Sequence, residues 1–238
     1  MGEKSVVVNL FGLNFNLTNC LGGTLVAVCT FILLYWLGHR ATIKPSKKQN
    51  FIEYFIDFTN NIVKDNVEDK DAQKHLSLYA FTLFMFIFFM NQLGLFFEFS
   101  INDHILVKSP TANPMITMTM ALMTLLLSYN YGVAKYGLKG YLGSYAKPVG
   151  FMLPINLIEE FTNFLTLSLR LYGNIYAGEV LLTLIGDRFA KSAGWITTIA
   201  SIPLTVVWQG FYVFIGSIQA YVFVTLSMVY IGKKVTKE

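Results

Sequence analysis

The chain has 238 residues, of which 54% are hydrophobic and only 13% are charged. In soluble domains about a quarter of the residues are charged. This composition therefore excludes an ordinary soluble domain and indicates a multi-pass membrane protein. The formal net charge of +4 comes with lysines that stand between apolar runs, so we interpret it as a topology signal and expect no nucleic-acid partner.

The first apolar run covers residues 18–38, which is long enough for a helix to cross a bilayer of about 30 Å. Tyr35 and Trp36 stand at its end, where aromatic side chains gather at the membrane surface. Basic residues follow in the loop 39–48. The excess of positive charge in cytoplasmic loops then places this loop inside and the N-terminus outside. We expect the run to be retained as an anchor, because the chain start lacks a basic signal-peptide region.

Residues 50–65 show a different pattern, with apolar and aromatic side chains on one helical face and acids and amides on the other. The apolar face consists of Phe51, Tyr54, Phe55, Phe58 and Ile62. This pattern predicts an amphipathic helix that lies on the cytoplasmic surface of the membrane. We expect the acidic stretch 65–74 to be a solvated connector.

The second and third crossings are predicted at residues 76–97 and 115–131, with an external loop at 101–114. Asn91 and Gln92 lie near the outer end of the second crossing. Buried amides bond across helices for about 0.6–2 kcal/mol, and an ion-path role is equally open. Lys135, Lys139 and Lys147 follow in a Gly- and Tyr-rich segment, which we expect to be a cytoplasmic loop.

The last two apolar runs cover residues 149–185 and 195–231, joined by an external turn at 186–194. At about 1.5 Å per residue each helix exceeds roughly 50 Å, so both must tilt strongly or lie partly in the membrane plane. The C-terminus is basic and therefore cytoplasmic. The sequence thus predicts an all-α polytopic membrane protein, forming a single integral membrane domain over 1–238. It has five membrane-crossing helices, one interfacial amphipathic helix and a long, strongly tilted final hairpin.

One polar stripe runs along the fourth predicted crossing. Helical spacing puts Glu159, Asn163, Thr166 and Asn174 on the face of Arg170. An arginine at a helix centre costs about 2.5–3.5 kcal/mol in membrane insertion, and such residues are functional by default. Its charge is permanent, so it can hold an anion but cannot relay a proton. The alternative is a structural arginine paired with a carboxylate on a neighbouring helix.

The last predicted crossing carries a second stripe. Its members recur at spacings of three and four residues: Gln209, Tyr212, Gly216, Gln219 and Phe223. Glycine-mediated packing around a satisfied glutamine explains this stripe as well as a functional role does.

The stretch from Leu167 to Glu179 (LSLRLYGNIYAGE) resembles the signature of subunit a of the F-type ATP synthase membrane sector. Shorter matches support the resemblance at 91–95 (NQLGL), 109–113 (SPTAN) and 218–221 (IQAY). The resemblance extends over about residues 47–233. The segment 48–53 (KQNFIE) and the compact length resemble versions from Firmicutes.

The resemblance implies a stator subunit that packs against a ring of c subunits, with the subunit b stalk, the other ATP synthase subunits and the lipid bilayer as further partners. The family's essential arginine matches Arg170. Its outer-channel glutamate matches Glu179, and its last-helix glutamine matches Gln219. Some relatives carry a titratable residue where Tyr212 stands, so here the outer path leans on Glu179, Thr183 and water. The resemblance also implies a multi-pass protein of the bacterial plasma membrane and a non-catalytic role. It implies no cofactor beyond a translocated proton, with sodium left open.

The spacing along the fourth crossing suggests how such a subunit works. Glu159 lies on the cytoplasmic side of Arg170 and Glu179 on the outer side, at about 16 and 14 Å along the axis. Two half-channels offset about the arginine would let a proton cross only when the ring turns. The candidate path residues are Glu179, Thr183, Gln219, Asn174, Glu159, Glu160, Asn163, Tyr212 and Asn91.

Three other classes of protein are alternatives to this interpretation. A secondary transporter or ion channel could use the same buried charges, but it predicts inverted repeats and broken helices, which the sequence does not show. A purely structural assembly subunit would tolerate any residue of similar packing at position 170. An intramembrane enzyme is disfavoured because the sequence offers no nucleophile or metal-binding set.

Overall fold

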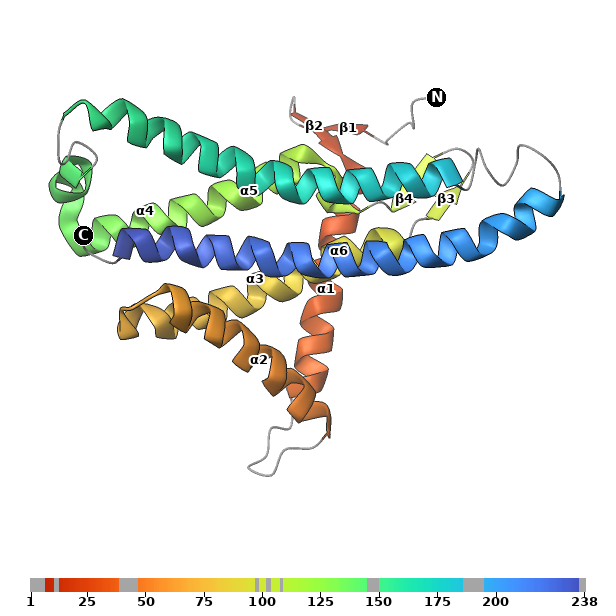
Figure 1. Cartoon of the computed structure of the whole chain (residues 1–238), viewed down its shortest axis with the longest axis horizontal. Coiled ribbons are helices and arrows are strands. Elements are labelled where there is room, and N and C mark those ends of the chain that lie inside the picture. The colour runs from red at the N-terminus through yellow and green to blue at the C-terminus, as the bar shows by residue number, and fades with distance from the viewer. Residues whose placement is uncertain are drawn as a thin grey trace. The chain divides into compact units, whose positions relative to one another are not determined.

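The computed structural model describes residues 7–10, 13–38, 47–96, 99–101, 104–107, 109–144, 150–185 and 195–235 (Figure 1). Within these residues helices dominate, as the sequence predicts. They are α1 (Leu17–Gly38), α2 (Lys47–Asn66), α3 (Lys70–Phe96), α4 (Pro114–Ser144), α5 (Met152–Thr183) and α6 (Trp195–Val235). The loop 39–46 and the turn 186–194 lie outside the described residues.

Two short antiparallel hairpins add to the helices and were not predicted. The first pairs β1 (Val7–Leu10) with β2 (Leu13–Asn16), and the second pairs β3 (Phe99–Ile101) with β4 (His104–Val107). The second hairpin lies in the predicted external loop and is followed by a 3₁₀ turn, η1 (Pro110–Ala112). Strands this short give too little alternation of apolar and polar residues for a sequence pattern to reveal them.

The chain forms two compact units, and α3, α5 and α6 contribute to both. Unit 1 comprises Met1–Trp36, Met85–Asn113 and Leu171–Ala220. Unit 2 comprises Leu37–Phe84, Pro114–Arg170 and Tyr221–Glu238. Each unit is described separately below.

Three of the described helices are long and apolar enough to cross a membrane. The qualifying segments are Lys70–Leu93, Pro114–Tyr141 and Ser201–Val235, and Cys20–Trp36 is a shorter apolar helix. The helix α5, which carries Glu159, Glu160, Arg170 and Glu179, does not qualify. These lengths support a multi-pass membrane protein. The five crossings and the tilted hairpin stay predictions.

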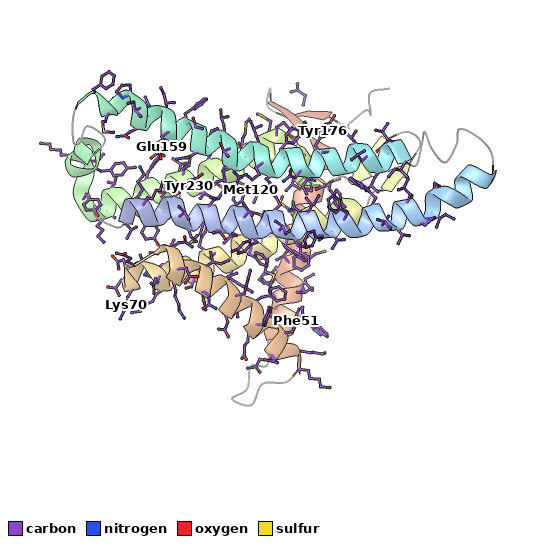
Figure 2. All side chains as sticks on the ribbon, in the orientation of Figure 1. Phe51, Lys70, Met120, Glu159, Tyr176 and Tyr230 are labelled. Atoms are coloured by element: carbon purple, nitrogen blue, oxygen red, sulfur yellow. The ribbon has the colours of Figure 1, made fainter. Side chains whose placement is uncertain are left out.

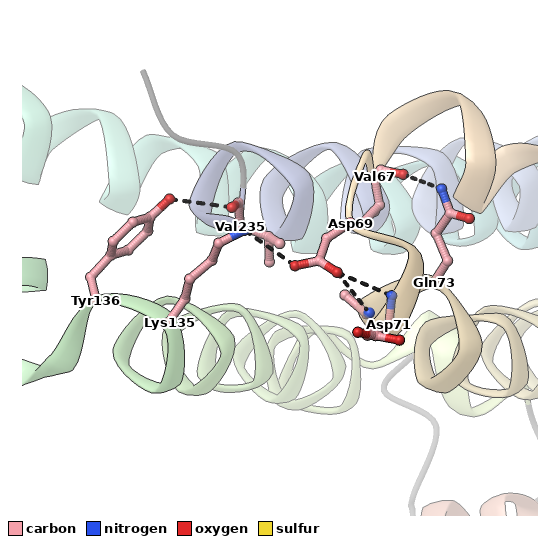
Figure 3. Close-up of polar contacts among 8 residues, drawn as sticks. Val67, Asp69, Asp71, Gln73, Lys135, Tyr136 and Val235 are labelled. Carbon is pink, nitrogen blue, oxygen red and sulfur yellow. Dashed lines mark hydrogen bonds and ion pairs between the residues drawn. The ribbon is translucent and has the colours of Figure 1, made fainter.

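The connector between α2 and α3 is shorter than predicted, because α3 already begins at Lys70. Asp69 caps this helix: its Oδ1 accepts hydrogen bonds from the backbone N–H groups of Asp71 (3.0 Å) and Ala72 (3.4 Å). The Gln73 side chain donates to the backbone oxygen of Val67 at 2.6 Å and closes the turn (Figure 3). The expectation of a solvated connector over 65–74 is therefore wrong for residues 65–66, which end α2, and for residues 70–74, which begin α3.

The basic segment after the third crossing is helical, which corrects the predicted loop. The helix α4 continues through Lys135 and Lys139, with a kink at Gly137, where φ is 70°. Only glycine adopts positive φ readily, so the helix can bend there without strain. Lys147 lies outside the described residues.

The last helix also extends beyond its predicted end at residue 231. Lys233 and Lys234 occupy the last turn of α6, where cations interact favourably with the helix dipole.

Unit 2 holds α2 by its aromatic face. The ring centroid of Phe58 lies 5.6 Å from that of Phe84 and 5.6 Å from that of Tyr221. Phe51 and Tyr54 of the same predicted face are exposed. The amphipathic helix is therefore present with bounds Lys47–Asn66, and only part of its apolar face packs against other helices of unit 2.

Candidate functional site

One apolar face of α5 is buried, and the polar stripe is partly exposed. Leu167, Leu171 and Ile175 are fully buried, whereas Arg170 and Asn174 are exposed. Among the described residues no carboxylate forms an ion pair with Arg170. The structure therefore gives no support to an ion pair between Arg170 and a described carboxylate, and the exposed guanidinium is accessible to a partner.

Unit 2 contains a cavity of about 180 Å³ on the side of Arg170 toward the start of α5. Its lining is polar and comes from α4, α5 and α6: Ser128, Asn156, Glu159, Glu160, Asn163, Tyr230, Lys233 and Lys234. Glu159 and Tyr230 are labelled in Figure 2. Among the lining residues, Glu159, Glu160 and Asn163 are predicted path residues, and the other five are not. The two lysines belong to the basic C-terminal segment, whose charge in the sequence indicates topology alone.

Both glutamates of the cavity face a lysine of α6. Lys233 Nζ lies 3.7 Å from Glu159 Oε1, and Lys234 Nζ forms an ion pair with Glu160 Oε1. The Tyr129 hydroxyl of α4 donates to Glu160 Oε2 at 3.2 Å. Glu160 is thus held by two neighbouring helices, and Glu159 by one.

Unit 1 contains the second polar region, where α5 and α6 are joined by a pair of side-chain amides. Asn174 Nδ2 donates to Gln219 Oε1 at 2.8 Å, and Gln219 is buried. This contact brings together two residues that the sequence analysis placed on separate stripes. The two amides can hydrogen-bond to a chain of water molecules, but they cannot themselves release a proton at working pH.

The two helices also meet closely at Gly178. The Trp208 indole N–H donates to the backbone oxygen of Gly178 at 3.3 Å, and the ring of buried Tyr212 lies directly against this glycine. Glu179 follows in the chain and is half-buried. The hydroxyl of Thr183 donates to the backbone oxygen of Glu179 at 2.9 Å, so its proton is used within the helix.

Asn91 and Gln92 of α3 bond across to α6 within the same unit. Asn91 Nδ2 donates to the backbone oxygen of Gly216 (2.9 Å), and Gln92 Nε2 to that of Val213 (3.2 Å). This geometry favours the cross-helix interpretation for their N–H groups. Their side-chain oxygens are buried and have no hydrogen-bond partner among the described residues, so they can still accept from water.

No group of three or more metal-ligating side chains is close enough to hold a metal ion within the described part of the chain. The two polar regions each combine at least one glutamate with amides and hydroxyls. The polar side chains can bind water, and the glutamates can take up and release a proton.

The fold and these polar regions define a helical, multi-pass membrane protein with charged and amide side chains along its long helices. The family model for the ATP synthase A chain matches residues 21–232. The chain is 52% identical to ATP synthase subunit a of Limosilactobacillus fermentum and 47% identical to that of Enterococcus hirae, with all of each chain covered. It is also 44% identical over its full length to the Listeria welshimeri subunit. The chain therefore belongs to the ATP synthase subunit a family.

Proposed function

We propose that the chain is the proton-translocating stator subunit a of a rotary ATP synthase, with two half-channels offset on either side of Arg170. The observation that carries this proposal is the order of groups along α5. A cavity with Glu159 and Glu160 precedes the arginine, and an amide and carboxylate region with Asn174 and Glu179 follows it. Family membership supports the same role in the membrane sector.

The outer half-channel uses the polar region of unit 1. A proton enters at Glu179 and passes along water held by Thr183, Tyr212, Asn91 and the Asn174–Gln219 pair to a carboxylate of the c-ring. The inner half-channel is the cavity of unit 2, where Glu159, Glu160 and Asn163 connect the ring to the cytoplasm. A proton crosses only when ring rotation carries it from one region to the other.

Arg170 supplies two effects in this scheme. Its charge favours the ionised form of the ring carboxylate that faces it, because an opposite charge stabilises a carboxylate. The same charge repels a hydronium ion that would pass directly from one half-channel to the other. The exposure of Arg170 in the isolated chain fits this role, since a charge in lipid is stable only against a polar partner.

Exposed apolar side chains of unit 1 suit a membrane-embedded partner. Tyr176 of α5, and Phe214 and Ile218 of α6, are exposed although they are apolar. We assign this surface to the c-ring and to lipid, and further contacts to subunit b and the other ATP synthase subunits. The protein then sits in the bacterial plasma membrane with its N-terminus outside and its C-terminus in the cytoplasm.

The test uses two substitutions of Arg170 in the assembled complex. Arg170→Lys keeps a charge but loses the planar fork and can shed its proton when buried, so we expect ATP synthesis to be nearly abolished. Arg170→Ala removes the barrier between the half-channels, so vesicles should leak protons passively. The measurements are ATP synthesis, dye-reported proton flux and a blot for subunit a.

A structural arginine predicts the opposite pattern, with Arg170→Ala lost from the membrane and Arg170→Lys nearly normal. Well-assembled Arg170→Lys complexes that synthesise ATP at normal rates would refute the proposal. A transporter or channel would instead conduct ions when the chain is reconstituted without a c-ring, and a subunit a should not.

A further inference from the structure

The two glutamates of the unit 2 cavity differ sharply in their surroundings. The side chains of Glu160 and Lys234 are only 14% and 23% exposed, whereas those of Glu159 and Lys233 are 56% and 61% exposed. Ion pairs between exposed side chains contribute about 0–1 kcal/mol and hold little geometry. The Glu159 carboxylate is therefore free to reorient in solvent, and the Glu160 carboxylate is not.

The Glu160 carboxylate is fixed through both of its oxygens. Lys234 approaches Oε1 from α6, and the Tyr129 hydroxyl donates to Oε2 from α4 at 3.2 Å. Lys234 itself lies over the ring of Tyr141, with Nζ 5.7 Å from the ring centroid, within the range of a cation–π interaction. Three helices thus set the position of one carboxylate at the cavity wall.

The end of α6, which carries Lys234, is itself hydrogen-bonded to α4. The Tyr136 hydroxyl donates to the backbone oxygen of Val235 at 3.2 Å (Figure 3), and Ser128 Oγ donates to that of Tyr230 at 3.1 Å. Both bonds tie α6 to α4 on either side of Lys234. Lys234 is therefore attached to a fixed helix end, which distinguishes it from a mobile terminal lysine.

We propose that Glu160 is the principal proton-carrying carboxylate of the inner cavity, and that Lys234 and Tyr129 are the positioning residues that aim it. This inference rests on the proposed function of the chain. A proton that arrives from the ring converts the Glu160 carboxylate into a neutral carboxylic acid, so the attraction between that carboxylate and the Lys234 ammonium is lost. The restored attraction between Lys234 and the carboxylate then favours release of that proton to cavity water.

The other ionisable groups around the cavity do not replace Glu160 in this role. Glu159 and Lys233 also line the cavity, but their side chains are 56% and 61% exposed. A carboxylate that is not positioned transfers protons less efficiently, because proton transfer requires a hydrogen-bonding geometry of about 2.6–3.2 Å. We therefore expect Glu159 to contribute less than Glu160.

The experiment compares single variants in the assembled ATP synthase, measured as ATP-driven proton pumping in inverted vesicles. Glu160→Gln should lower pumping by at least about tenfold, because the amide that replaces the carboxylate cannot take up and release a proton. Lys234→Gln and Tyr129→Phe should each lower it by roughly threefold to tenfold. Glu159→Gln should have a clearly smaller effect than Glu160→Gln.

A double variant separates positioning from general structure. If Lys234 acts through Glu160, Lys234→Gln should add almost nothing in a Glu160→Gln background, whereas independent structural effects would multiply. Lys234→Arg retains the charge and should restore most of the rate. Lys74→Gln is the matched control, because Lys74 also pairs with an acid of unit 2, Asp71 at 3.5 Å, but is 77% exposed.

This inference is overturned if assembled Glu160→Gln or Tyr129→Phe complexes pump at the wild-type rate. It is also overturned if the two glutamate substitutions lower pumping equally. Multiplying losses in the double variant also overturn it. If the inference about Glu160 fails but Arg170→Lys is inactive in the same vesicles, the proposed function still holds. If Arg170→Lys pumps normally, both proposals fail. A blot for the chain in each membrane excludes loss by misassembly, and Tyr129→Phe serves where Glu160→Gln does not assemble.

Discussion

Gly178→Ala is the sharpest test of the packing between α5 and α6 in unit 1. A Cβ atom at this position would lie 2.5 Å from Cε2 of Tyr212, and closer still to Cδ2. Carbon atoms in ordinary contact are about 3.5–4.0 Å apart, so the ring must move by roughly an ångström. Tyr212 is only 3% exposed, which leaves its ring little room to move.

The expected magnitude follows from two opposing effects. Overpacking a buried site costs typically about 1–3 kcal/mol, and replacing glycine by alanine within a helix gains back up to about 1 kcal/mol. We expect a net loss of about 1–2 kcal/mol in the free energy of unfolding. Gly173→Ala on the same helix is the control, because nothing lies within 4 Å of its added Cβ and only the helix gain applies.

The assay is unfolding of the purified full chain in detergent, followed by circular dichroism. Gly178→Ala should unfold more easily than the wild type, and Gly173→Ala slightly less easily. Combining Gly178→Ala with Tyr212→Leu should cost less than the sum of the two single changes, since the leucine removes the ring that collides. Equal stability of the two alanine variants would refute the close approach of Tyr212 to Gly178.

Three further predictions concern unit 2 and topology. Gly232→Ala should impair folding more than substitution of any exposed glycine, because its Cβ would collide with the backbone oxygen of Asn66. A normal yield of this variant in membranes would contradict the prediction. The pKa of Asp69 is lowered, chiefly by the hydrogen bond from Lys135 and further by the backbone amides of α3. The contact therefore stabilises the fold at neutral pH, and this stabilisation is lost when acid protonates the carboxylate. Asp69→Asn keeps a helix cap, so it should be less stable than the wild type at pH 7 and equal to it in acid, which thermal unfolding across pH would measure. A cysteine at Lys139 should react only with reagents added from the cytoplasmic side, and external labelling would reverse the proposed orientation.

Much of this protein could be predicted from local pattern. The apolar and amphipathic patterns locate the six described helices, although α4 extends well past its predicted end. A backbone in lipid must satisfy its own hydrogen bonds, and an uninterrupted apolar run can do so only as a helix. The face shared by Asn163, Arg170 and Asn174 follows from the helical repeat alone. The helix ends were less well predicted, since they depend on single groups such as the Asp69 cap and on Gly137, where α4 bends without ending.

Only the tertiary structure decided which polar side chains meet. Asn174 and Gln219 are 45 residues apart, and no periodicity relates them. Glu159 and Glu160 are adjacent and chemically identical in sequence, yet only Glu160 is enclosed by a lysine of α6 and a tyrosine of α4. A residue's helical face is set by its immediate neighbours in the chain, whereas its partner is set by how distant helices fit together. The sequence by itself therefore determined the helices and the charged stripe of this subunit, and packing determined which of its carboxylates is held in place.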